Sequence, residues 1–140
     1  MVAIVKVKTG SKAEALGSYS RIVAVDDLIF VSNTAGRNPQ TGLIPADPAE
    51  QTRQVLANIE RALAAVDATL ADVVAARVFI QFPEDIDAVM AAYAERMRGI
   101  EPTLTLTSPP LGSSAFKVEI EVTAWRGASA ADVEEIVLPA

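Results

Sequence analysis

Residues 117–125 read Lys-Val-Glu-Ile-Glu-Val-Thr-Ala-Trp, the most regular alternating run in the chain. Successive side chains of a β-strand point to opposite faces, so this run predicts a strand with one face against a core. The core face would carry Val118, Ile120, Val122 and Ala124. The opposite face would carry Glu119, Glu121, Thr123 and Trp125.

Five other runs predict further strands of the same sheet. Valine and lysine alternate in residues 5–8, and threonine and leucine alternate in residues 103–107. The acidic pair Asp26-Asp27 separates two short hydrophobic runs, which indicates a β-hairpin. Residues 33–47 predict a loop with its tight turn at 38–42. The five runs are residues 1–9, 22–25, 28–32, 73–82 and 103–107.

Two amphipathic helices are predicted between these strands. Asp47 can cap the first helix, Pro48 suits its first turn, and Glu50 would complete a capping box. Gln51 and the other polar residues lie largely off its apolar stripe, and the second helix follows Pro83 and ends near Gly99. The two stripes are Val55, Leu56, Ile59, Ala62, Leu63 and Val66, and Ile86, Val89, Met90, Tyr93, Ala94 and Met97.

The 140 residues are therefore predicted to form one α+β domain, with the order β-β-β-α-β-α-β-β. Two helices can cover only one face of such a sheet. The other face would carry a mixture of charged and aromatic side chains that is too apolar to lie in water, so we expect burial against copies of the same chain. This mixture consists of Arg77, Phe79, Glu119, Glu121 and Trp125.

The composition excludes several classes of function. The chain has no cysteine and no histidine, which excludes disulfides, thiolate nucleophiles and the usual ligands of a zinc site, so we expect neither metal nor cofactor. The net charge of −6 argues against a nucleic-acid partner, and no apolar run is long enough to span a membrane. We expect a cytoplasmic protein that binds a small-molecule metabolite and copies of itself.

Five short motifs, in their order and spacing, make the sequence resemble the Rid family, the RidA/YjgF or endoribonuclease L-PSP group. The resemblance covers residues 15–126, and residues 127–140 form a C-terminal tail of the same domain. We expect residues 132–135 of this tail to be solvated and residues 136–138 to dock on the body of the chain. The motifs are Gly17 to Ser20, Asp27 to Ser32, Asn38 to Gly42, Gln51 to Ile59 and Val118 to Glu121.

The resemblance implies a chorismate-mutase-like fold, a sheet with two helices on one face, assembled as a homotrimer with ligand clefts between subunits. It also implies hydrolysis of reactive imines or enamines to 2-oxo acids and ammonia. By this resemblance Glu119 is the catalytic residue. Tyr19, Ser32, Thr34, Leu104 and Thr105 occupy the substrate-binding positions.

One residue of the family's site is missing. Leu104 stands where the family has the arginine that holds the substrate carboxylate, and leucine cannot form hydrogen bonds with a carboxylate. The sequence therefore predicts a substrate other than a simple 2-imino acid. Arg37 or Arg98 could supply a replacement guanidinium. Asn33-Thr34 also replaces the family's Gly-Gln pair.

Other interpretations stay open at this point. A trimer that binds a metabolite without converting it is the main alternative to an imine deaminase. A ribonuclease is disfavoured because cleavage of a phosphodiester needs cationic and acid–base groups near the phosphate. Glu119 could instead form an ion pair with Arg77 between subunits, Tyr19 could pack a loop onto the sheet, and Ser32 and Thr34 could satisfy local backbone groups.

Overall fold

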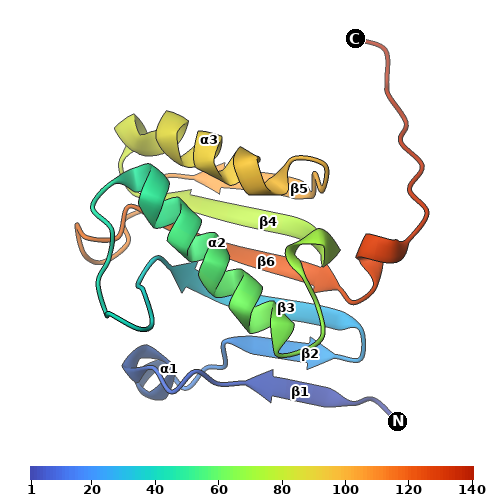
Figure 1. The fold of residues 1–140 in the computed structure, drawn as a ribbon, viewed down its shortest axis with the longest axis horizontal. Helices are drawn as coiled ribbons and strands as arrows, with labels where there is room; N and C mark the ends of the chain where they lie inside the picture. Colours follow the sequence, from blue (N-terminus) through green and yellow to red (C-terminus); the bar gives the residue numbers. More distant parts are fainter.

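The computed structural model describes residues 1–140, in which six strands form one sheet with the order β1-β2-β3-β6-β4-β5 (Figure 1). Neighbouring strands are antiparallel except for β4 and β5, which are parallel. The strands are β1 (Ile4–Val7), β2 (Ile22–Val25), β3 (Leu28–Ala35), β4 (Val73–Ile80), β5 (Thr103–Thr107) and β6 (Val118–Trp125).

Two helices, α2 (Pro48–Ala64) and α3 (Ile86–Met97), cover the same face of the sheet, as the sequence predicts (Figure 1). Both apolar stripes face the sheet and contribute to one continuous core. Single turns of 3-10 helix, η1 (Leu70–Asp72), η2 (Pro83–Asp85) and η3 (Ala128–Ala130), connect the main elements. No helix combines the length and the apolar character needed to cross a bilayer.

The start of α2 is capped as predicted, although two of its side chains behave differently. The Asp47 carboxylate accepts a hydrogen bond from the Glu50 N–H at 2.9 Å, but the Glu50 carboxylate pairs with Arg53 rather than completing a capping box. Gln51, expected off the apolar stripe, is completely buried. Its amide is tolerated there because every polar atom has a partner.

Gln51 connects α2 to the strand that carries Glu119. Its Nε2 donates to the carbonyls of Pro45 and Ala115, at 2.8 and 2.9 Å. Its Oε1 accepts from the N–H groups of Lys117 and Val118, at 2.7 and 3.2 Å. The first residues of β6 are therefore fixed in position immediately before Glu119.

We call the sheet face opposite α2 and α3 the bare face. The alternation along β6 is confirmed, because Val118, Ile120, Val122 and Ala124 are buried on the helix side. On the bare face, Phe30 and Trp125 are 47% and 51% exposed. Phe30 lines a shallow concavity of about 430 Å³ together with Val23, Ser32, Ala75, Arg77, Glu121 and Thr123. A concave face of this kind is suited to contact with another protein surface.

Three local expectations were wrong. The third strand continues to Ala35 because it resumes pairing with β6 after a register shift between Val31 and Thr34. A short helix, α1 (Lys12–Gly17), precedes β2, where no periodic apolar stripe predicted one. Residues 136–138 do not dock on the body of the chain but are exposed.

Candidate functional site

Tyr19 is held in place by a tight turn at the end of α1. Ser18 has a left-handed backbone with a φ of 53°, and the Tyr19 N–H donates to the Glu14 carbonyl at 3.1 Å. The Tyr19 ring lies over Gly17, where an added Cβ would come within 2.8 Å of the ring carbon Cδ1. Glycine at this position therefore allows the ring to lie close to the backbone.

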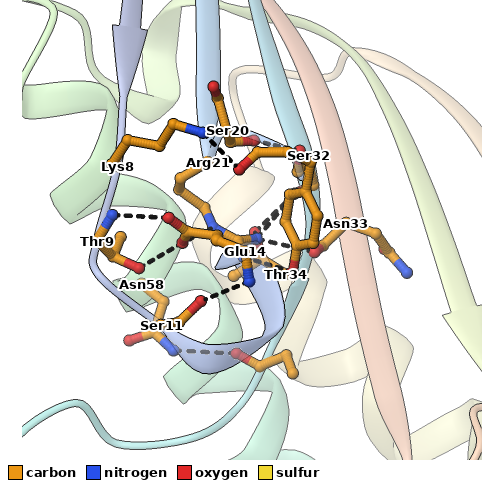
Figure 2. A network of polar contacts seen from close by, with 12 residues as sticks. Lys8, Thr9, Ser11, Glu14, Ser20, Arg21, Ser32, Asn33, Thr34 and Asn58 are labelled. Atoms are coloured by element: carbon orange, nitrogen blue, oxygen red, sulfur yellow. Dashed lines mark hydrogen bonds and ion pairs between the residues drawn. The ribbon is translucent and has the colours of Figure 1, made fainter. Parts of the chain in front are cut away.

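Arg21 lies at the centre of the polar network around Tyr19 (Figure 2). Its Nη1 donates to the Asn33 carbonyl at 2.9 Å and to Thr34 Oγ1 at 3.1 Å. Its Nη2 lies 3.4 Å from the Tyr19 hydroxyl, and its guanidinium carbon lies 5.6 Å from the centre of the Tyr19 ring. One side chain thus connects the Tyr19 turn to β3.

Glu14 holds Arg21 from the other side. Its Oε2 lies 3.5 Å from Arg21 Nε, and the side chain is almost completely buried. Burial alone would raise the pKa of Glu14, but hydrogen bonds from Thr9 and Ser11 and the charge of Arg21 hold this pKa below its usual value. Sequence reasoning missed both residues, because a buried ion pair between a short helix and a strand leaves no periodic signal.

Glu119 is brought into this network by the irregularity in β3. Asn33 lies within the register shift, and its Nδ2 donates to Glu119 Oε1 at 3.0 Å. Burial raises the pKa of Glu119 above its usual value, and the positive charge of Arg21 offsets only part of this effect. The carboxylate is therefore a stronger base than that of an exposed glutamate. Asn33 Oδ1 is buried and has no partner.

Ser32 and Thr34 use their hydroxyl groups locally. Ser32 Oγ donates to the Ser20 carbonyl at 2.7 Å, and Thr34 Oγ1 donates to the Ser32 carbonyl at 2.8 Å. These bonds match the expectation that both hydroxyls satisfy backbone groups. Both residues belong to the structure around Tyr19 and Glu119.

Leu104 lies apart from this group, on the helix side of the edge strand β5. It is in register with the buried Ala76 of β4, and it lines a groove of about 330 Å³ beneath α3. Arg98 lines the same groove. The groove is otherwise mainly apolar; its remaining lining residues are Met90, Tyr93, Ala94, Met97, Glu101 and Pro102.

The other sequence candidates occupy different positions. Thr105 is in register with Arg77 and so lies on the bare face, opposite to Leu104. Arg77 pairs with Glu121 at 2.7 Å within the same chain rather than with Glu119. Arg37 donates to the Gly42 carbonyl at 2.8 Å and lies over the Phe116 ring, in the loop after β3. Within one chain, Tyr19, Ser32, Thr34 and Glu119 gather, whereas Leu104 and Thr105 do not join them.

Replacing Arg21 with glutamine tests the network. Arg21→Gln should raise the pKa of Glu119 further, because the one charge that lowers it is lost. It should also lower the free energy of unfolding by about 1–3 kcal/mol, because Glu14 stays buried without its ion pair. Carboxyl-carbon NMR titration and urea unfolding would measure these changes. The exposed Arg61→Gln is the matched control, and an unchanged Glu119 pKa would refute this role of Arg21.

The sequence matches one family model and is similar to relatives that share one name. A family model described as "Endoribonuclease L-PSP" matches residues 9–126. The 2-iminobutanoate/2-iminopropanoate deaminase of Rattus norvegicus is 34% identical over 124 residues, which cover 87% of this chain and 90% of the relative. The protein of the same name from Escherichia coli K12 is 33% identical over 87 residues, covering 62% of this chain and 68% of the relative.

Solved structures show the same fold. A YjgF-family protein from Mycobacterium tuberculosis superposes with a TM-score of 0.79 at 32% identity, covering 88% of this chain and 99% of the other. The YjgF protein of E. coli has a TM-score of 0.77 at 29% identity, with 87% and 98% covered. E. coli TdcF, whose crystals contain bound serine, has a TM-score of 0.72 at 28% identity, with 77% and 87% covered.

Proposed function

Since the chain belongs to the RidA/YjgF family, which is also described as endoribonuclease L-PSP, we propose that it hydrolyses reactive imines or enamines. The observation that carries this proposal is Glu119, a half-buried carboxyl with a raised pKa that Asn33 holds beside the Arg21 network. The names of relatives with 30% and 34% identity, 2-iminobutanoate/2-iminopropanoate deaminases, support the same reaction class.

The reaction needs one group that both accepts and donates a proton. Water adds to the carbon of the C=N bond, and Glu119 as a carboxylate takes the proton from this water. Glu119 as a carboxylic acid then gives the proton to the nitrogen. The product of these two steps is a carbinolamine. Glu119 then takes the proton of the carbinolamine hydroxyl group and gives it to the nitrogen, so that the C–N bond breaks, ammonia leaves and the carbon becomes a carbonyl. Because burial raises the pKa of Glu119, its carboxylate is a stronger base than that of an exposed glutamate, which favours its taking up the proton before giving it to the nitrogen.

The substrate of this chain should carry an apolar group where the family's substrates carry a carboxylate. Leu104 replaces the family's arginine and lies in a groove with Met90, Tyr93 and Met97. An apolar group gains free energy when such a groove removes it from water, whereas a carboxylate would lose hydration without gaining a paired donor at Leu104.

A complete cleft requires a second copy of the chain. Glu119 is in register with Phe79, which puts its side chain on the bare face. Leu104 is in register with Ala76 and lies on the helix side, at the sheet edge. The two halves of the site can face each other when the Glu119 region of one copy meets the Leu104 groove of another. The proposed assembly is the homotrimer that the family resemblance implies.

Introducing the missing guanidinium tests the substrate proposal. We expect little turnover of 2-iminopropanoate or 2-iminobutanoate by the wild type. Leu104→Arg should increase kcat/KM for these substrates about 10–100-fold, because charged hydrogen bonds to a carboxylate contribute roughly 1.5–3 kcal/mol. The increase in kcat/KM would be measured as ammonia release from an imine that a second enzyme generates, with semicarbazide present as a competitor for the imine. Leu104→Met, of similar size and without charge, should stay at the wild-type rate.

One result would contradict the apolar substrate, and another would show that the change at Leu104 is not the only difference from the family. Rapid wild-type turnover that Arg98→Gln abolishes would show that Arg98, in the same groove, holds the carboxylate. A folded, trimeric Leu104→Arg variant that neither binds nor converts 2-imino acids would show that the groove differs from the family's in shape as well as in charge.

A further inference from the structure

The last ten residues of the chain, which we call the C-terminal segment (residues 131–140), make no contact that buries them. Every residue of this segment is exposed. Its four large aliphatic side chains, Val133, Ile136, Val137 and Leu138, are between 74% and 85% exposed. Four such side chains within six residues form an apolar strip that favours burial against another surface.

The chain is firmly held up to the point where this segment begins. Arg126 donates to the Val66 carbonyl and to the Asp27 carboxylate, each at 2.9 Å. The Ser129 N–H donates to the buried Asp72 carboxylate at 2.8 Å. The segment therefore leaves the body from a fixed position.

The segment extends away from the body of its own chain. Figure 1 shows it rising past β4, β5 and α3, on the opposite side of the sheet from the N-terminus. Ten extended residues span roughly 33 Å, whereas the two strands between β6 and the sheet edge occupy only about 10 Å. The segment can thus reach well beyond the edge of its own sheet.

A complementary surface exists at the opposite edge of the sheet. We call it the N-terminal patch, which consists of exposed side chains on both faces of β1, on the residues before it and on α1. It comprises Val2, Ile4, Val5 and Leu16, together with Lys6 and Lys12. Its four aliphatic side chains are between 49% and 89% exposed. Neither lysine forms an ion pair, and β1 has a strand neighbour on one side only.

We propose that the C-terminal segment of one copy docks along the N-terminal patch of a second copy. The two surfaces match in chemistry: the segment is apolar and acidic through Asp132, Glu134 and Glu135, and the patch is apolar and basic. The free edge of β1 can also accept an added strand, because its outward N–H and C=O groups have no strand partner. This interaction is independent of the proposed reaction.

Site-specific cross-linking gives a direct test, because the chain contains no cysteine. Val5→Cys and Val137→Cys would be made as separate variants, one with a mass tag, and refolded together from urea. Under mild oxidation we expect a mixed product with the mass of one tagged and one untagged chain. Ala91→Cys, exposed on α3, replaces Val5→Cys as the matched control and should give at least severalfold less mixed product.

The charges provide a second test that leaves the core untouched. Glu134→Lys with Glu135→Lys in the Val137→Cys chain should reduce the mixed product severalfold. Adding Lys6→Glu and Lys12→Glu to the Val5→Cys chain should restore it. The proposal would be overturned if Ala91→Cys gave as much mixed product as Val5→Cys, or if charge reversal left the yield unchanged. It would also be overturned if a chain carrying both Val5→Cys and Val137→Cys formed its disulfide only within the chain.

Discussion

Glu119→Gln should lower the rate of imine hydrolysis by about 10²–10⁴-fold, the range that general acid–base groups usually contribute. Glutamine has nearly the same shape and can still accept the hydrogen bond from Asn33 Nδ2, but it cannot take a proton from water. Ammonia release from an apolar imine would measure the loss. Asp87→Asn, at an exposed position on α3, the helix that covers the opposite face of the sheet, is the control and should retain the wild-type rate.

The pH dependence separates this role from a structural one. If Glu119 acts first as a base, wild-type activity falls as the pH falls through the pKa of Glu119. This fall in activity should lie above the usual glutamate pKa of 4.5, because burial raises the pKa.

A raised pKa also means that ionised Glu119 lowers the free energy of unfolding once the pH exceeds the folded-state pKa. Glu119→Gln should therefore be at least as stable as the wild type at neutral pH. Full activity of this variant would show that Glu119 is not the group that transfers the proton.

Phe30→Asp should dissociate the proposed homotrimer. Light scattering should then give the mass of one chain instead of the mass of three. Phe30 is about half exposed on the bare face and lines its concavity, so a contact between copies would bury the new carboxylate without a partner. Leu43→Asp, at a more exposed position in the loop before α2, should leave the mass unchanged.

Two results would refute this assembly. A wild type that is monomeric at micromolar concentration would exclude it, and so would a Phe30→Asp variant that stays trimeric. Because the two halves of the proposed cleft come from different copies, the Phe30→Asp monomer should also lose its activity.

The main elements could be predicted because their signals are local. The alternation in β6 and the stripe of α2 follow from which side chains face a core, and both are confirmed. The failures depend on contacts with residues outside the element concerned. Gln51 is buried because loop carbonyls and the start of β6 happen to satisfy its amide, and α1 depends on Glu14 reaching Thr9 and Arg21. Spacing within one element contains no information on such partners.

For the candidate site, the sequence named several residues but not the residue that connects them. Tyr19, Ser32 and Glu119 gather as their family positions imply, but Arg21, which connects them, was not identified. Asn33 reaches Glu119 only because β3 shifts register beside it. An irregularity of this kind arises when two strands distant in sequence are aligned, so no single run of residues predicts it.

Arg21 stands near two carboxyl groups whose proton affinities have moved in opposite directions. As acidity increases, Glu119 takes up its proton early, whereas Glu14 keeps its charge and its ion pair. Chemistry would therefore stop before the surrounding architecture loses an anchor. If Glu119 carries the proposed reaction, activity lost at moderately low pH should return on neutralisation, because the Glu14–Arg21 ion pair remains in place.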